Sequence, residues 1–180
     1  VLSDDCFLVG DPADNLDRGS LVLYQKVDGA FAEYGSVNHS ATFNIAANGH
    51  LSFSFASCAG CDANDKAFLV GVPGVGGQRN DINGKVLLYD YSGTALKLNS
   101  TFDVGTDADT SDFGFGVSVG LTESFVYIGA PGGINGKGAV ACYGRYAGSK
   151  GLGWEDYTIK GFTANGNLGR ALSVTENHMV

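Results

Sequence analysis

All three prolines of this chain close the same short motif, in which a glycine stands two positions before the proline and an apolar residue precedes that glycine. The motif reads VGDP at 9–12, VGVP at 70–73 and IGAP at 128–131, so consecutive prolines are 61 and 58 residues apart. Nearly constant spacing between copies of one motif predicts a chain of tandem structural repeats. The residues that define the motif are Gly10, Pro12, Gly71, Pro73, Gly129 and Pro131.

A second motif follows each proline and consists of a glycine, a variable residue, an apolar run and a tyrosine. It reads GSLVLY at 19–24, GKVLLY at 84–89 and GAVACY at 138–143. The distance from the proline to this glycine is 7, 11 and 7 residues, whereas the distance from the glycine to the tyrosine is always five. Strands of constant length joined by loops of variable length are typical of a structural repeat.

A third motif alternates large apolar residues with Gly, Ala or Ser. FGFGVSV at 113–119, which begins with the pair Phe113 and Gly114, aligns with LGRALSV at 168–174. LSFSFA at 51–56 keeps the alternation but lacks the Phe-Gly pair. Alternation with a period of two predicts a strand that has one bulky face and one very small face.

Each period of about 60 residues therefore holds four short strands, the last of them introduced by a turn such as Asp28-Gly29. No segment of helical length shows a 3.6-residue periodicity. We predict an all-β chain that forms about three four-stranded antiparallel blades of a β-propeller, with other all-β folds as the alternative. The chain is expected to be a single propeller fragment, 1–180, with blades at 1–47, 48–108 and 109–164 and the first strand of a further blade at 165–180.

Together these motifs resemble the FG-GAP repeats of integrin α-subunit propellers and of large secreted or surface proteins of microbes. The pair Phe113 and Gly114 and the IGAP run at 128–131 stand as the family name spells them. The resemblance covers essentially the whole chain and implies a propeller with a binding or scaffolding role. Because three blades cannot close a ring, we expect the remaining blades in a longer chain or in other copies.

Calcium is the one cofactor that the sequence suggests. Many FG-GAP repeats carry a calcium loop before the Gly-Ala-Pro motif, but residues 121–124 lack that pattern. A different acidic loop, which contains Asp107, Asp109 and Asp112, could supply several of the oxygen ligands that Ca²⁺ takes. The alternative is a solvated loop between blades, in which each Asp side chain caps its own turn.

Cys58 and Cys61 form a C-x-x-C pair among the four cysteines of the chain. A redox motif would need a strand-to-helix context that the sequence lacks, and a zinc site would need a second pair of ligands at similar spacing. We therefore expect a local disulfide that staples a strand end. Cys142, in the middle of an apolar strand, is expected to be a small buried residue.

Two Asn-x-Ser/Thr acceptors begin at Asn38 and Asn99, each 26 residues after a repeat proline. This phase places both near the outermost strand of a blade, where a glycan would block edge-to-edge pairing of sheets. Glycosylation is the hypothesis, and acceptors that occur by chance are the alternative. Together with the cysteines, these acceptors favour an extracellular or cell-surface protein.

The composition excludes two classes of partner. A net charge of −8 and a pI of about 4.6 argue against binding to nucleic acid, because an acidic surface repels phosphates. No apolar run approaches the ~20 residues that span a bilayer, so no membrane insertion is expected. The three histidines fall at unrelated phases of the repeat and no nucleophile motif is present, so we expect no enzyme.

The variable loops at 11–18, 74–83 and 132–137 are the expected recognition surface, since variable loops on a repeated scaffold carry binding. The predicted function is an extracellular module that binds a protein or glycan partner in adhesion or surface assembly. A lectin-like propeller, an accessory propeller of a secreted hydrolase and a purely architectural role are the alternatives.

Overall fold

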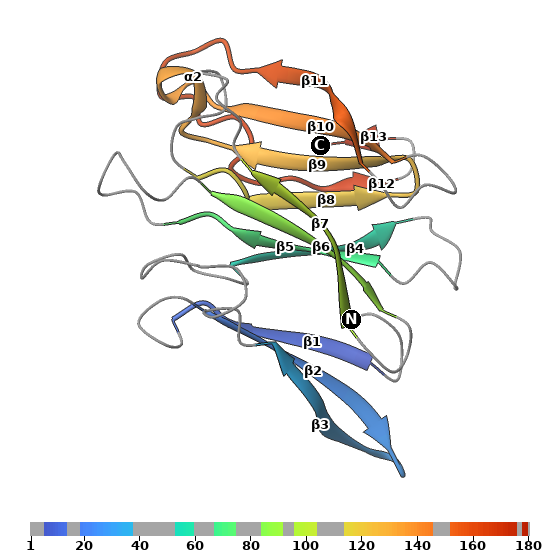
Figure 1. Cartoon of the computed structure of the whole chain (residues 1–180). Coiled ribbons are helices and arrows are strands. Elements are labelled where there is room, and N and C mark those ends of the chain that lie inside the picture. Colours follow the sequence, from blue (N-terminus) through green and yellow to red (C-terminus); the bar gives the residue numbers. More distant parts are fainter. Residues whose placement is uncertain are drawn as a thin grey trace.

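The computed structural model of the chain describes residues 6–13, 19–37, 53–59, 67–74, 84–91, 96–103, 114–145, 152–175 and 178–179. Strands and tight turns form nearly all of this part (Figure 1). Its one helix, α2 (Gly133–Gly136), is a single turn in which three of the four residues have positive φ. The prediction of an all-β chain is thus confirmed. Within these ranges, no helix has the length and apolarity that a membrane crossing requires.

A first, three-stranded antiparallel sheet lies at the N-terminal end of the chain. Its order is β1-β2-β3, with β1 at one edge. The turn between β2 and β3 has positive φ at both Asp28 and Gly29, as the sequence predicted for a two-residue hairpin. The strands are β1 (Cys6–Asp11), β2 (Ser20–Val27) and β3 (Ala30–Val37).

The other long strands form one eight-stranded sheet in the order β11-β10-β9-β8-β4-β5-β6-β7. Each half of it is a four-stranded antiparallel meander, and the halves meet through a short parallel pairing of β4 with β8. The first half contains β4 (Ser54–Ala59), β5 (Ala67–Val72), β6 (Lys85–Tyr91) and β7 (Leu96–Asp103). The second half contains β8 (Ser118–Thr122), β9 (Phe125–Ala130), β10 (Ala139–Arg145) and β11 (Leu152–Lys160). We call the halves the second and third sheets.

A small hairpin of β12 (Val174–Thr175) and β13 (His178–Met179) follows the third sheet. Val174 pairs with Met179, and Thr175 pairs with His178. In the third sheet, the pair nearest the turn between β8 and β9 is Leu121 with Val126, which are as far apart along the chain as Val174 and Met179. The hairpin therefore repeats the first turn of the third sheet.

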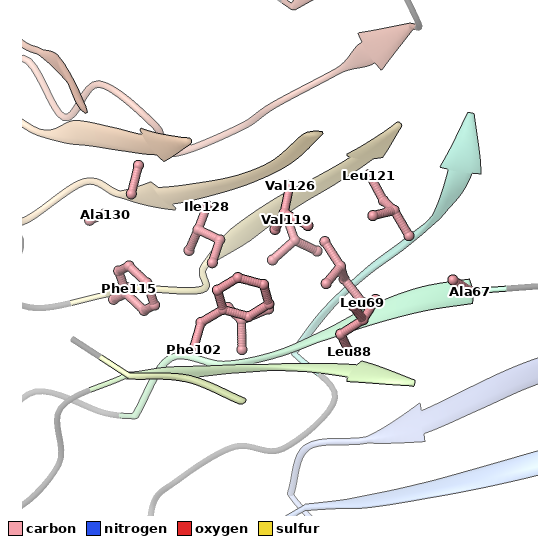
Figure 2. Packing of buried hydrophobic residues seen from close by; sticks show 12 residues of the cluster. Ala67, Leu69, Leu88, Phe102, Phe115, Val119, Leu121, Val126, Ile128 and Ala130 are labelled. Carbon is pink, nitrogen blue, oxygen red and sulfur yellow. The ribbon is translucent and has the colours of Figure 1, made fainter. Parts of the chain in front are cut away.

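Two apolar cores lie between the faces of the three sheets. The first and second sheets share a core in which Leu21 and Leu23 of β2 are packed with Phe68 and Val70 of β5. The second and third sheets share the other core, where side chains from both sheets point toward one another (Figure 2). Successive residues of β5 point to opposite faces, so Phe68 enters one core and Leu69 the other. This is why β5 is apolar at every position and buried on both faces.

The repeated tyrosine makes the same contact in two sheets. Phe68 and Tyr89 stack with ring centroids 5.3 Å apart, and Phe7 and Tyr24 stack with centroids 5.1 Å apart. A shift of strand register also recurs immediately before each repeated tyrosine, at Leu23/Tyr24, Leu88/Tyr89 and Cys142/Tyr143. Recurrence of a β-bulge at one phase shows that the sequence repeat is also a structural repeat.

The repeat glycines Gly71 and Gly129 occupy equivalent contacts between sheets. A Cβ atom on Gly71 would overlap the carbonyl of Gly116, and a Cβ atom on Gly129 would overlap the carbonyl of Gly169. A serine beside each glycine donates a hydrogen bond to the same carbonyl, from Ser54 Oγ over 2.7 Å and from Ser118 Oγ over 2.6 Å. Glycine is required here because the next segment of backbone lies where a side chain would be.

These contacts correct the alignment of FGFGVSV at 113–119 with LGRALSV at 168–174, which makes Gly114 equivalent to Gly169. Phe113 itself lies outside the described residues. In the structure Gly116, and not Gly114, contacts the preceding sheet as Gly169 does. The equivalent pairs are therefore Phe115-Gly116 and Leu168-Gly169. FGFG contains two Phe-Gly pairs, and only packing between sheets distinguishes them.

Replacing Ser118 with alanine is expected to lower the free energy of unfolding by about 1–2 kcal/mol, because the buried carbonyl of Gly169 loses its hydroxyl donor. Chemical denaturation measures this difference. The exposed Ser173 gives a matched control, whose replacement by alanine should stay within about 0.5 kcal/mol of the wild type. Equal losses for the two variants would contradict the role given to Ser118.

Stability should decrease at alkaline pH because of Tyr89. Burial raises the pKa of Tyr89 above its ordinary value of 10.0, so the folded state holds a proton that the unfolded chain releases. The resulting contribution is complete below pH 10 and is lost as the pH rises toward the folded pKa. Unfolding free energies measured from about pH 9 to 11 should fall less for Tyr89→Phe than for the wild type. Parallel curves for the two proteins would contradict this assignment.

Candidate recognition surface

The loop after Pro131 is the one predicted recognition loop that the structure describes throughout. The loops at 11–18 and 74–83 are described only at residues 11–13 and at Gly74. In the third loop Ile134, Asn135 and Gly136 all have positive φ, which folds the chain into a compact coil. Such a conformation is costly for Ile134 and persists only where surrounding bonds hold it in place.

Those surrounding bonds come from within the coil and from the segment at 161–168, which follows β11. The amide of Gly138 donates to Gly133 O over 2.9 Å, and the amide of Lys137 donates to Ile134 O over 3.3 Å. From the second segment, the amide of Leu168 donates to Lys137 O over 3.1 Å. The two loops therefore form one backbone-bonded unit at this end of the third sheet.

The side chains on this pair of loops combine one bare aromatic ring with several amides. Phe162 is 95% exposed, the highest value among the exposed large apolar residues of the described chain. Asn135, Asn165 and Asn167 are exposed on the same two loops, and Asn167 Nδ2 donates to Asn165 O over 3.1 Å. An exposed aromatic ring can stack on an apolar face of a ligand, and exposed amides can hydrogen-bond to its polar rim. We call Phe162 and these three asparagines the loop patch.

Tyr157 of β11 is the second tyrosine, after Tyr89, whose pKa is raised. It lies on the third sheet and outside the two loops of the loop patch. Almost half of Tyr157 is exposed, yet its pKa is raised, first by desolvation of the hydroxyl and then by hydrogen bonding with Cys142 and Tyr127. Tyr157 and Tyr127 both pair with Cys142, so the three side chains form a cross-strand row. Cys142 is buried, as predicted, and it is not in a disulfide bond. Both causes favour the neutral phenol over the phenolate.

The predicted calcium ligands Asp107, Asp109 and Asp112 lie outside the described residues, so this site stays a prediction. Within the described ranges, no group of three or more His, Cys, Asp or Glu side chains is arranged to hold a metal ion.

Cys58, near the end of β4, is disulfide-bonded, whereas Cys6 and Cys142 are not. Its predicted partner, Cys61, lies outside the described residues, and that pairing stays a prediction. Arg145 Nη1 donates to Cys58 Sγ over 3.3 Å and to Thr122 O over 2.8 Å. This guanidinium therefore joins the ends of β4 and β8, where the second and third sheets meet.

Asn99, one of the two predicted glycosylation sites, lies in β7, the edge strand of the second sheet. It is the residue left over at the bulge, because Leu88 pairs with Ser100 and Tyr89 pairs with Leu98. Asn99 Nδ2, the atom that would carry the glycan, donates to Asp90 Oδ2 over 2.9 Å. Asn38 lies outside the described residues, and glycosylation of both stays a prediction.

No protein-family model matches the chain, and no curated protein matches it. The FG-GAP resemblance therefore rests on the motifs of the chain itself.

Reasoning from sequence did not single out Phe162 or its neighbouring asparagines. Two signals were available. Phe162 is an aromatic residue within a run of polar and small residues, and Asn165, Gly166 and Asn167 form a turn-rich segment. Neither signal says that this segment lies beside the loop after Pro131, because the bonds between the two loops depend on the tertiary fold.

Proposed function

We propose that the chain is part of an extracellular β-propeller of the FG-GAP type, a non-catalytic module that binds a protein or glycan ligand through loops at one end of its sheets. Support for the propeller comes from the recurrence of one inter-sheet contact, in which Gly71 and Gly129 each receive the backbone of the following repeat. One contact repeated between successive sheets is expected of propeller blades, which are arranged around a common axis.

The single observation that carries the binding role is the loop patch. Phe162 is almost fully exposed, so its ring is available to a ligand, and aromatic side chains are enriched among the residues that dominate binding energy. The left-handed coil at 134–136 supports the same view, because backbone strain is retained where it shapes a functional loop.

A carbohydrate is the ligand class that the loop patch favours over a flat protein surface. Sugar rings offer an apolar face to an aromatic side chain and hydroxyl groups to amides, and Phe162 with Asn135, Asn165 and Asn167 offers both complements.

A glycan array probed with the intact chain tests this function. We expect a set of related glycans to bind, and Phe162→Ala to weaken that binding by at least about tenfold through loss of an aromatic anchor. Val27→Ala is the control, because Val27 is also an exposed apolar residue but lies at the hairpin end of β2. Binding that Phe162→Ala leaves unchanged would contradict the loop patch as the site. An array without bound glycans would direct the search to protein ligands.

A further inference from the structure

Positive charge is concentrated in the C-terminal third of this acidic chain. Residues 1–123 contain six Lys and Arg against sixteen Asp and Glu, whereas residues 124–180 contain five against three. Residues 124–154 contain no Asp or Glu, and neither do residues 157–175. Because a region dominated by one sign of charge attracts ions of the other sign, an anionic ligand binds more favourably to this part than to the rest of the chain.

Three of these cations are attached to the two loops that carry the loop patch, and we call Lys137, Lys160 and Arg170 the loop cations. The carbonyl of Lys137 accepts a hydrogen bond that joins the two loops, and Lys160 immediately precedes the second loop. The amide of Arg170 donates to Asn167 O over 3.2 Å, and Asn167 is itself part of the loop patch. The backbone bonds of the fold therefore bring three cations to one end of the third sheet.

The loop cations are accessible to a ligand. Lys160 and Arg170 are exposed, and Lys137 is half-buried. Within the described part of the chain, neither Lys137 nor Arg170 forms an ion pair with a carboxylate. Both side chains can therefore take an anionic group of a ligand as their counter-ion, in a charge-assisted hydrogen bond.

The acidic residues of the third sheet lie away from the loop cations. Glu123 lies in the turn before β9, at the end of that strand away from the loop patch. Asp156 precedes Lys160 by four residues in β11, which is about 13 Å along an extended strand. Glu176 follows Arg170 by six residues and lies outside the described residues. Since the Debye length is about 8 Å at physiological ionic strength, carboxylates as distant as those of Glu123 and Asp156 neutralise the loop cations only weakly.

We propose that the loop patch binds an acidic glycan, whose carboxylate or sulfate group is held by the loop cations. The guanidinium of Arg170 can donate two parallel hydrogen bonds to either group, while the ring of Phe162 takes the apolar face of a sugar. An extended polyanion such as nucleic acid fits less well, because the excess of carboxylates in residues 1–123 repels it. This inference rests on the carbohydrate-binding role proposed above and specifies the class of glycan.

Pairs of glycans that differ only in an acidic group test the inference on the intact chain. The array should hold sialylated and asialo forms of one core and sulfated and unsulfated forms of another, which distinguishes a carboxylate from a sulfate. Among the pairs that bind, the acidic member should bind at least about tenfold more tightly than the neutral member. This preference should fall as the salt concentration rises from about 50 to about 500 mM, because salt screens the cations.

The outcomes of this array separate the inference from the proposed function. Equal binding of the acidic and neutral members would overturn the inference and leave glycan binding in place. An array without any bound glycan would overturn the inference together with the choice of a carbohydrate ligand. Competition by inorganic polyphosphate as strong as that by the acidic glycan would show attraction of any anion, and it would also overturn the inference.

Variants test whether the loop cations cause the preference. Arg170→Gln should reduce the preference by at least about fivefold and leave the affinity for the neutral member unchanged, because only the acidic group loses a partner. Arg170→Lys, which keeps the charge, should retain part of the preference. Lys97→Gln is the matched control, since Lys97 is an exposed cation in β7 of the second sheet, and it should change neither affinity.

Phe162→Ala should weaken binding of both members of a pair alike, because its ring contacts the sugar that they share. Far-ultraviolet circular dichroism of each variant checks that the fold is retained. A preference that Arg170→Gln and Lys137→Gln both leave intact would place the acidic group away from the loop cations, and it would overturn the inference.

Discussion

Replacing Phe68 with alanine is expected to lower the free energy of unfolding by about 3–5 kcal/mol. Phe68 is 1% exposed in the core between the first and second sheets, and its ring stacks on Tyr89 with centroids 5.3 Å apart. The variant loses the transfer free energy of the ring and leaves a cavity that β-strands fixed on both sides cannot fill. Denaturation in urea, followed by far-ultraviolet circular dichroism, measures the difference.

Phe162 provides the control for this experiment, because it has the same side chain and is almost fully exposed. Phe162→Ala should stay within about 0.5 kcal/mol of the wild type. If Phe68→Ala lowered the free energy of unfolding no more than Phe162→Ala does, the first sheet would not pack on the second through Phe68. The core described between the two sheets would then be wrong.

Replacing Gly129 with alanine is expected to cost at least about 3 kcal/mol, since the new Cβ atom would overlap the backbone of Gly169. A side chain could turn away, but a backbone carbonyl that also accepts the Ser118 hydroxyl cannot move without separating the segments. The same argument applies to Gly71 and the backbone of Gly116. Thermal and urea unfolding of both alanine variants measure the effect.

Gly29 is the matched control for these glycines. It lies in the hairpin turn with φ of +85°, and a Cβ atom there would meet nothing within 4 Å. Gly29→Ala should therefore cost only the strain of a left-handed residue, about 1–2 kcal/mol. A loss for Gly129→Ala as small as that for Gly29→Ala would mean that the close approach between repeats does not exist.

The strands were largely predictable because their signals are local. The apolar runs before the prolines became β1, β5 and β9, and the runs that end in tyrosine became β2, β6 and β10. Asp28-Gly29 correctly predicted the turn that it forms. Such signals depend on side-chain alternation and turn chemistry within a few residues, which sequence records directly.

The contacts between sheets were less accessible to sequence reasoning. The choice between Gly114 and Gly116 in FGFG depends on which glycine meets the neighbouring sheet, so it could not be made from alternation alone. The bulge before each repeated tyrosine was also not predicted, because a one-residue change of register leaves no clear mark in composition. The loop patch was missed for the same reason, since it joins segments about 30 residues apart through backbone hydrogen bonds.

The division of the chain into blades of one propeller, and its extracellular binding role, stay predictions. The recurring contacts at Gly71 and Gly129 are the observation on which the propeller depends. They relate the second sheet to the third, and the third to the segment at Gly169 that leads into β12, by the same packing.

A crystal structure of the chain tests that packing most directly. Successive sheets should superpose by one common rotation about a shared axis, with the Ser54 and Ser118 hydroxyls bonded to the carbonyls of Gly116 and Gly169. Two sheets stacked as a closed sandwich, with Gly71 and Gly129 in unrelated surroundings, would contradict the repeat as the organising feature of this fold.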